Sequence, residues 1–460
     1  MADLTAYRLA KVVSYFVESD SADTALQQLF SLDEESGEIP SETIVTARTC
    51  RRWLRRMGFE WRTFGKNVYF DGHERDDVVS YRQNTFIPEW LKARERSLTY
   101  DPEADKWSFP PPEKHPSARP LVLVTHDEST FSANDGTRQG WVQNGRQPIR
   151  PKGRGRGIMV SAFLVSSGIL KVPDDISNEY LTSLPDWPRT PEGNPQREAW
   201  QALEYGSDTY WDGDKMVEQT IRLAIPIFRL AFPDCEALFA FDNASSHCSY
   251  SPDALLATKM NLGPGGKQPQ MRDGYHNGLR HGMQYPPDYP VAELRGKPKG
   301  LKQVLLERGL WVDRKPDGSK FQLTCPMKEG KSSCQGTSCC ARTLMASQPD
   351  FKEQKSRLQE CIEAAAHSVI FYPKFHCELN FIERFWCAAK YYAREHCSYS
   401  LQGLRAVVPK AIHSVPAKTI FKYHQRCERY IDAYSSGYSY GTEKLTQRVH
   451  KSHRKVGPHD

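Results

Sequence analysis

The sequence predicts an α/β fold in which a mixed β-sheet with flanking helices is interrupted by a large insertion and preceded by a helical region. Near-continuous apolar runs at 120–127, 158–165 and 237–243 predict strands that are covered on both faces. Helical periodicity at 215–232 and 379–395 places helices between and after these strands. Alternation of this kind is typical of a layered α/β architecture.

Size and composition set the broad class. A chain of 460 residues has room for about three domains. With 26% charged residues and a mean hydropathy of −0.64, it reads as soluble. No apolar run reaches the ~18 residues of a membrane span, and the N-terminus lacks a signal-peptide core. We therefore expect no membrane partner and no export, and the net charge of +6 favours a polyanionic partner only weakly.

The first region, residues 1–98, is predicted to be helical and to bind DNA through a helix-turn-helix at about 40–60. Residues 46–58 form its second helix, with an apolar stripe from Cys50 to Met57 and Gly58 as its stop. The remaining surface of this helix is basic and is expected to contact DNA through Arg48, Arg51, Arg52, Arg55 and Arg56. A basic surface helix of some other small bundle stays open as an alternative.

Composition divides the rest of the chain. A charged helix at 71–97 should be interrupted at Pro88. The predicted segments that follow are a Pro-rich linker at 99–119, the first part of a domain built on the sheet at 120–248, an insertion with a cysteine cluster at 249–366, the second part of that domain at 367–435 and a basic tail at 436–460. We place the insertion there because the sheet resumes only at about 367.

Three acidic residues follow or end apolar runs: Asp127, Asp242 and Glu383. Burying an unpaired carboxylate costs several kcal/mol, so such groups are usually paired or bound to metal. Three carboxylates can serve two Mg²⁺ ions if one of them bridges, which is the requirement of two-metal phosphoryl transfer. On the third segment, Glu378 and Glu383 differ by about 140° around a helix. Glu383 is preferred because it lies near the edge of the buried stripe.

These residues carry a resemblance to a known family. HDES (126–129), FDNASSH (241–247) and HCELNFIERFW (376–386) resemble the three catalytic blocks of mariner- and pogo-type DDE superfamily transposases and of their bacterial insertion-sequence relatives. The matching acids are Asp127, Asp242 and Glu383. The chain departs from the family's pattern in the 141 residues that separate the second and third acids and in HCELNF, which replaces a form like SPDLNP.

The resemblance implies an RNase H-like catalytic domain that uses two Mg²⁺ (or Mn²⁺) ions. It implies a nuclear enzyme that cuts DNA at transposon ends, joins those ends to target DNA and acts as a homo-oligomer. The DNA partners would be terminal inverted repeats and target DNA. Two alternatives remain open: a domesticated or decayed transposase that only binds DNA, and a structure-selective RNase H-like nuclease.

Several further residues could support this chemistry. Asn243, His247 and Asn380 could assist the metal ligands, although a cap and a surface histidine explain the first two as readily. Glu128 should point away from Asp127 because neighbouring side chains on a strand alternate. Arg154 and Arg156, spaced by glycines in KGRGRG (152–157), could follow a DNA backbone or simply belong to a flexible hairpin connection.

Four of the twelve cysteines cluster within sixteen residues: Cys325, Cys334, Cys339 and Cys340. In a chain without an export signal, such a cluster predicts a metal site or reduced thiols in preference to disulfides. A structural Zn²⁺ site is one interpretation. The spacing is irregular and lacks a CxxC, so a reduced loop is the other.

Overall fold

The computed structural model describes Arg52 and then residues 72–111, 118–136, 151–205, 211–244, 247–315, 318–325, 327–328, 331–332, 334 and 336–449. The chain divides into two compact units after Phe70, and the described residues other than Arg52 lie in the second. The predicted helix-turn-helix and its other four arginines lie outside the described residues, as does the end of the chain from 450 onward. None of the described helices combines the length and the apolar character that crossing a bilayer requires.

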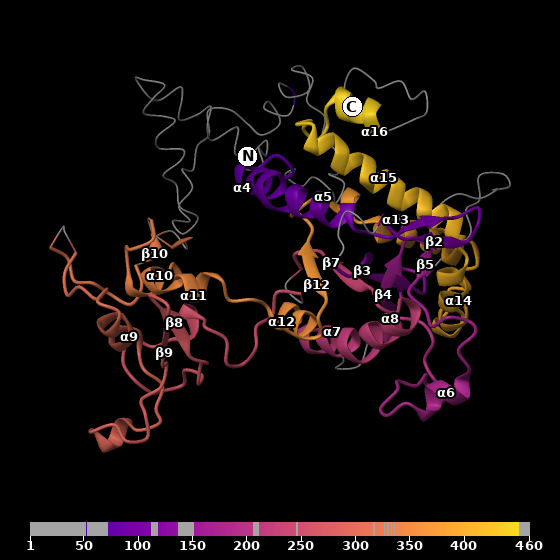
Figure 1. The fold of residues 1–460 in the computed structure, drawn as a ribbon. Coiled ribbons are helices and arrows are strands. Elements are labelled where there is room, and N and C mark those ends of the chain that lie inside the picture. The colour runs from indigo at the N-terminus through magenta and orange to yellow at the C-terminus, as the bar shows by residue number, and fades with distance from the viewer. Residues whose placement is uncertain are drawn as a thin grey trace. The chain divides into compact units, whose positions relative to one another are not determined.

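The centre of the second unit is a six-stranded mixed sheet (Figure 1). Its strands are β3 (Leu121–Ser132), β4 (Gly157–Val165), β5 (Gly168–Ile169), β6 (Trp200–Glu204), β7 (Glu236–Phe241) and β12 (Ser368–Phe371). The order is β12-β7-β3-β4-β5, and β6 also pairs with β4. β4 is antiparallel to β3, β5 and β6, whereas β3 and β12 both run parallel to β7. The predicted mixed sheet is confirmed.

Helices cover both faces of this sheet, as Figure 1 shows. One face carries α7 (Gly213–Gln219), α8 (Ile225–Ala231) and α12 (Arg357–Ala364), and the other carries α5 (Ile87–Glu95), α13 (Phe381–Glu395), α14 (Leu401–His413) and α15 (Ala417–Ser435). Successive side chains of β4 point to opposite faces of the sheet, so this strand contributes to the hydrophobic core on each face. Phe163 and Val165 pack toward α7 and α8, whereas Val160 and Ala162 pack toward α13 and α14.

Several prolines lie within continuous helical segments of the described residues, among them Pro88, Pro226 and, inside α14, Pro409. The first two each follow a π-helical turn. The predicted interruption at Pro88 is wrong: α4 (Asp76–Tyr81), the π-helical turn η1 (Arg82–Phe86) and α5 follow one another directly. The same arrangement recurs where η3 (Thr220–Ala224) precedes Pro226 in α8. A wider turn just before Pro88 and just before Pro226 accommodates the ring and the missing N–H of each, so the helix continues.

The predicted domain boundary at 98/99 and the linker at 99–119 need correction. α5 contributes Ile87 and Trp90 to a core that it shares with β3, β7 and β12, so this helix belongs with the main sheet. Residues 99–108 form a two-stranded antiparallel hairpin of β1 (Thr99–Asp101) and β2 (Lys106–Ser108). Tyr100 and Trp107 pack against each other across it. The apolar side chains explain why this segment folds despite the prolines that follow.

The insertion has a hydrophobic core of its own, with Leu255, Leu301, Leu305 and Met345 among its buried members. Its elements are η4 (Ala257–Lys259), β8 (Gly274–His276), β9 (Leu279–His281), η5 (Ala292–Leu294), α9 (Leu301–Glu307), β10 (Met327–Lys328), β11 (Lys331–Ser332), α10 (Ala341–Ala346) and α11 (Pro349–Lys352). The predicted end at 366 is too late, because Leu358 and Ile362 of α12 are buried in the core of the main sheet.

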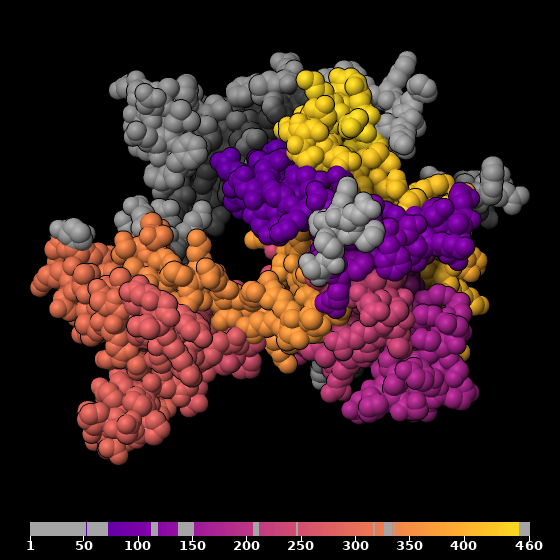
Figure 2. All heavy atoms as spheres, in the orientation of Figure 1, coloured from indigo at the N-terminus to yellow at the C-terminus, as the bar shows by residue number. Residues whose placement is uncertain are grey.

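The C-terminal helices pack against α5, so distant parts of the sequence lie together. Arg94 of α5 forms ion pairs with Glu428 and Asp432 of α15. Figure 2 shows the indigo surface of α4 and α5 beside the yellow C-terminal helices. The predicted start of the basic tail (436–460) is too early. Leu445 and Val449 of α16 (Glu443–Val449) are buried in the core that α5 shares with β3, β7 and β12. The remaining short helix is α6 (Asn178–Ser183).

Candidate active site

The register of β3 and β7 brings the first two predicted acids side by side. The parallel pairing ends with Thr125 opposite Ala240. Asp127 and Asp242 each lie two residues further on, so they occupy equivalent positions on the same face of the sheet. Asp242 directly follows β7, as predicted. Asp127 does not end its strand, because β3 continues along β4 to Ser132. Only the pairing of β3 with the parallel strand β7 ends near Asp127.

Asn380 fixes the helix that carries the third acid to the strand that carries the first. It is buried and is the N-cap of α13, where its side chain accepts a bond from the Ile382 N–H. Asn380 Oδ1 also accepts a bond from the Thr125 hydroxyl at 2.6 Å, and Nδ2 donates to the His126 carbonyl at 3.2 Å. Glu383, in the first turn of α13, is thereby held beside Asp127.

The buried face of α13 explains the direction of Glu383. Ile382, Trp386 and Ala389 are buried against the sheet, as the predicted stripe requires. Glu383 adjoins this stripe and keeps an exposed surface. It lies close enough to Asp242 for the two charges to interact.

The three acids repel one another. Burial and the carboxylates of Glu383, Glu128 and Asp242 raise the pKa of Asp127 well above its usual range. The surrounding protein and the Asp242 carboxylate raise the pKa of Glu383 as well. A lysine of α13, Lys390, opposes this effect on Glu383. The structure therefore brings Asp127, Asp242 and Glu383 into one electrostatic neighbourhood.

His247 lies between two carboxylates of this neighbourhood. Its Nδ1 donates to Asp242 Oδ1 at 2.6 Å, and its Nε2 lies 3.4 Å from Glu128 Oε1. Burial alone would lower the pKa of His247, but the two carboxylates raise it to about 10. In return, His247 lowers the pKa of both Asp242 and Glu128 against the effect of their burial. His247 is thus a buried cation that compensates two acids.

The sequence left open a supporting role for Glu128 at a metal, and the structure shows which residues this side chain contacts. Its side chain points to the opposite face from Asp127, as predicted, where Trp211 Nε1 donates to it at 2.5 Å. With His126 and His247 it offers ligand atoms that all lie within 4.8 Å of one another. His126 is uncharged, because burial lowers its pKa to about 3. The sequence signals for this cluster were the adjacent acids in HDES and the histidine of FDNASSH.

Glu378 lies apart from Asp127, Asp242 and Glu383, as the helix geometry predicted. It precedes α13 in η6 (Cys377–Leu379) and is buried. Glu378 Oε1 accepts bonds from His376 Nδ1 and from the Tyr434 hydroxyl, each at 2.7 Å. Burial would raise the pKa of Glu378, but His376, His73 and Tyr434 lower it to about 2.

His73, His376 and Glu378 also place ligand atoms within 4.8 Å of one another. The guanidinium of Arg82 donates to His376 Nε2 at 3.1 Å, so the other ring nitrogen carries the proton that binds Glu378. Arg82 is itself buried beneath Tyr434. A buried guanidinium against one of the candidate ligands disfavours a metal ion here, and the cluster reads as a structural network.

The other predicted residues are placed as follows. Asn243 Nδ2 donates to the Tyr372 carbonyl at 2.5 Å and so ties β7 to the segment after β12. Arg154 and Arg156 are exposed in the connection that enters β4. Their backbone carbonyls accept bonds from Asn134 and Ala133, so this part of the connection is ordered against the end of β3. Arg52 is exposed in a helical position.

Comparison with known proteins finds likeness in structure only. No protein-family model matches the chain, and no curated protein matches it. Three solved structures are similar at 10 to 11% identity: the Mos1 mariner paired end complex with Mn, a pre-cleavage Mos1 transpososome and the Mos1 Strand Transfer Complex. The similarity covers 94%, 96% and 96% of this chain and 79%, 82% and 81% of those chains, with TM-scores of 0.38, 0.39 and 0.36. Scores this low carry no argument about the function of this chain.

Proposed function

We propose that the chain is a DNA transposase of the DDE type, an endonuclease and strand transferase that cuts DNA at transposon ends and joins those ends to target DNA. One observation carries the proposal: acids from three distant segments, Asp127, Asp242 and Glu383, interact electrostatically where β7 ends beside the middle of β3. The order of the strands supports the RNase H-like character that the resemblance implies. By the same resemblance we propose that the chain works in the nucleus as a homo-oligomer on terminal inverted repeats and target DNA.

The donor set fits hard divalent cations. All three side chains offer oxygen, the ligand that Mg²⁺ and Mn²⁺ prefer. The raised pKa values of Asp127 and Glu383 show acids whose mutual repulsion a cation would relieve. When bound, two such ions would supply the activation of the attacking oxygen and the stabilisation of the leaving oxygen in an in-line displacement. The predicted ligands are Asp127, Asp242 and Glu383.

Neighbouring residues orient these ligands. His247 and the Ala244 N–H both donate to Asp242 Oδ1, so we assign Oδ2 of Asp242 to the metal. Asn380 and Thr125 hold α13 against β3 and set the approach of Glu383 to Asp127. Arg154 and Arg156 extend from the connection before β4, where we propose that they contact the DNA backbone.

The test is metal-dependent nicking of DNA that carries the repeats flanking the gene. We expect product with Mg²⁺ or Mn²⁺ and a loss of at least 100-fold in Asp127→Asn and Glu383→Gln. Glu395→Gln is the matched control, because Glu395 lies at the far, exposed end of the same helix. Nicking that survives both active-site changes would remove these acids from the mechanism.

Binding must be measured on the same variants. A chain that binds the repeats with salt-sensitive affinity but never cuts them is a DNA-binding protein, the first alternative from the sequence. Cleavage confined to hybrid or branched substrates would instead indicate a structure-selective nuclease. Metal binding can be read without cleavage, because Mn²⁺ should raise the melting temperature of the wild type and fail to do so in Asp127→Asn.

A further inference from the structure

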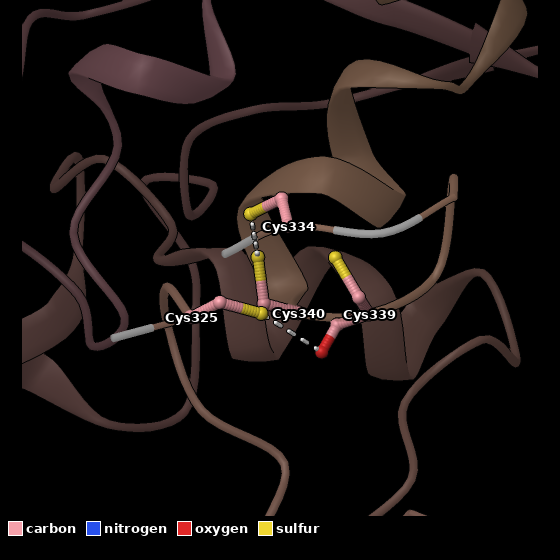
Figure 3. Close-up of side chains that lie close together, drawn as sticks. All are labelled: Cys325, Cys334, Cys339 and Cys340. Atoms are coloured by element: carbon pink, nitrogen blue, oxygen red, sulfur yellow. Dashed lines mark hydrogen bonds between the residues drawn. The ribbon is translucent and has the colours of Figure 1, made fainter. Parts of the chain in front are cut away.

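The four clustered cysteines of the insertion converge in space (Figure 3). Cys325 and Cys334 flank the short hairpin of β10 and β11, and Cys339 and Cys340 directly precede α10. Their sulfur atoms all lie within 4.8 Å of one another. Two chain segments thus contribute two thiols each, although the cysteines are irregularly spaced in sequence.

The separations suit a tetrahedral ion. Four sulfurs at the usual Zn–S distance of about 2.3 Å stand about 3.8 Å apart along the edges of a tetrahedron. Cys334 Sγ and Cys340 Sγ are 3.9 Å apart, which is close to this edge and far longer than a disulfide bond. The larger separations, up to 4.8 Å, need shifts of an ångström or less to meet an ion.

The surroundings favour thiolate ligation. Thr343, one turn into α10, donates its hydroxyl to Cys334 Sγ at 3.4 Å and lies 3.1 Å from Cys340 Sγ. Hydrogen bonds of this kind orient metal ligands and stabilise their charge. Cys340 is buried, and the next residue, Ala341, belongs to the insertion's hydrophobic core. A ligand at this point would anchor the cluster to that core.

The insertion also needs a link of this kind. The strands β10 and β11 have two residues each, and α10 and α11 have six and four. An isolated hairpin of this length is not stable in water, and small cores are commonly stapled by a metal or by disulfides. We propose that Cys325, Cys334, Cys339 and Cys340 bind one structural Zn²⁺ ion that joins the hairpin to α10. This site is independent of the cutting of DNA.

The first experiment is elemental analysis of the purified full-length chain. We expect about one zinc per chain, falling at least tenfold when Cys325→Ser and Cys334→Ser are combined. Cys361→Ser is the matched control and should keep its zinc, because Cys361 lies in α12, outside the cluster. Asp127→Asn should also keep its zinc, which separates this site from the proposed catalytic centre.

A second measurement covers loss of metal during purification and failure of the double variant to fold. The wild-type chain is stripped with a chelator and titrated with Co²⁺, and each single serine variant is treated in the same way. We expect intense thiolate-to-cobalt charge-transfer absorption in the wild type and a weakened, shifted spectrum in each variant. Absence of zinc together with absence of this absorption would overturn the proposal. So would oxidised cysteines under reducing purification, or zinc that the serine changes leave in place.

Discussion

Replacing Glu378 by glutamine tests whether the two acids near α13 have opposite roles. Glu378 binds His376 and Tyr434 in a buried network, whereas Glu383 faces other acids. The Glu378 pKa of about 2, against an ordinary 4.5, corresponds to about 3 kcal/mol of stability near pH 7, at about 1.4 kcal/mol per pKa unit. Glutamine keeps the shape and one acceptor oxygen but not the charge. We therefore expect Glu378→Gln to lose about 3 kcal/mol.

The pH dependence gives the sharper result. A carboxyl whose folded-state pKa is lowered stabilises the protein above its unfolded pKa and loses that contribution as the pH falls toward the folded pKa. For Glu378 the window runs from about pH 4.5 to about pH 2. The difference between wild type and Glu378→Gln should therefore shrink to roughly 1.4 kcal/mol at pH 3.

The assay is urea unfolding followed by tryptophan fluorescence in metal-free buffer at pH 7 and pH 3. Trp90 and Trp386 are buried in the cores on the α13 face, so their emission reports on this part of the unit. Glu383→Gln is the comparison, because it removes a repelled charge and should leave stability equal or higher. A Glu378→Gln variant as stable as the wild type at pH 7, or a deficit of equal size at both pH values, would refute the reasoning.

Three further changes test other parts of the structure. Asn380→Ala removes a helix cap and leaves buried partners unpaired, so urea unfolding should show a loss of about 2 to 4 kcal/mol and nicking should slow; a loss under about 1 kcal/mol would contradict the anchoring role. Arg154→Ala with Arg156→Ala should weaken DNA binding and lower the slope of log affinity against log salt by about 2, and an unchanged slope would remove these arginines from the interface. Arg308→Met leaves buried Asp350 without its partner, at a cost of about 3 to 5 kcal/mol, so limited proteolysis should cut the insertion faster and spare the main sheet.

The sheet could be predicted because its strands are buried on both faces. β4 is buried at every position, and such a run is recognisable in a single sequence. The pairing of the strands could not be predicted in this way, because register depends on contacts between segments more than 100 residues apart. The sequence therefore predicted only that Asp127 and Asp242 each lie at the end of an apolar run. It could not show that they occupy matching positions on neighbouring strands.

The errors have a common physical cause. In the sequence, Pro88 resembles a helix break and residues 99–108 resemble part of a Pro-rich linker. Tertiary packing decides otherwise, because Trp90 is buried in a core shared with the sheet and Tyr100 packs against Trp107. The end of the insertion was placed too late for the same reason. The apolar stripe of α12 is visible in the sequence, but which of two cores it joins is decided only in three dimensions.

The distribution of charge supports the proposed cation site. Four carboxylates lie near the end of β7 and the middle of β3, and the charged His247 lies between Asp242 and Glu128. His247 lowers the pKa of Glu128 and Asp242, so these two are already compensated by the protein. Asp127 and Glu383 keep raised pKa values, although Lys390 lowers the pKa of Glu383 in part. An arrangement that held all four acids neutral or paired would need no metal ion. We infer that the region between β3 and α13 can accept further positive charge, and a divalent cation bound there would bring together the three acids of the proposed mechanism.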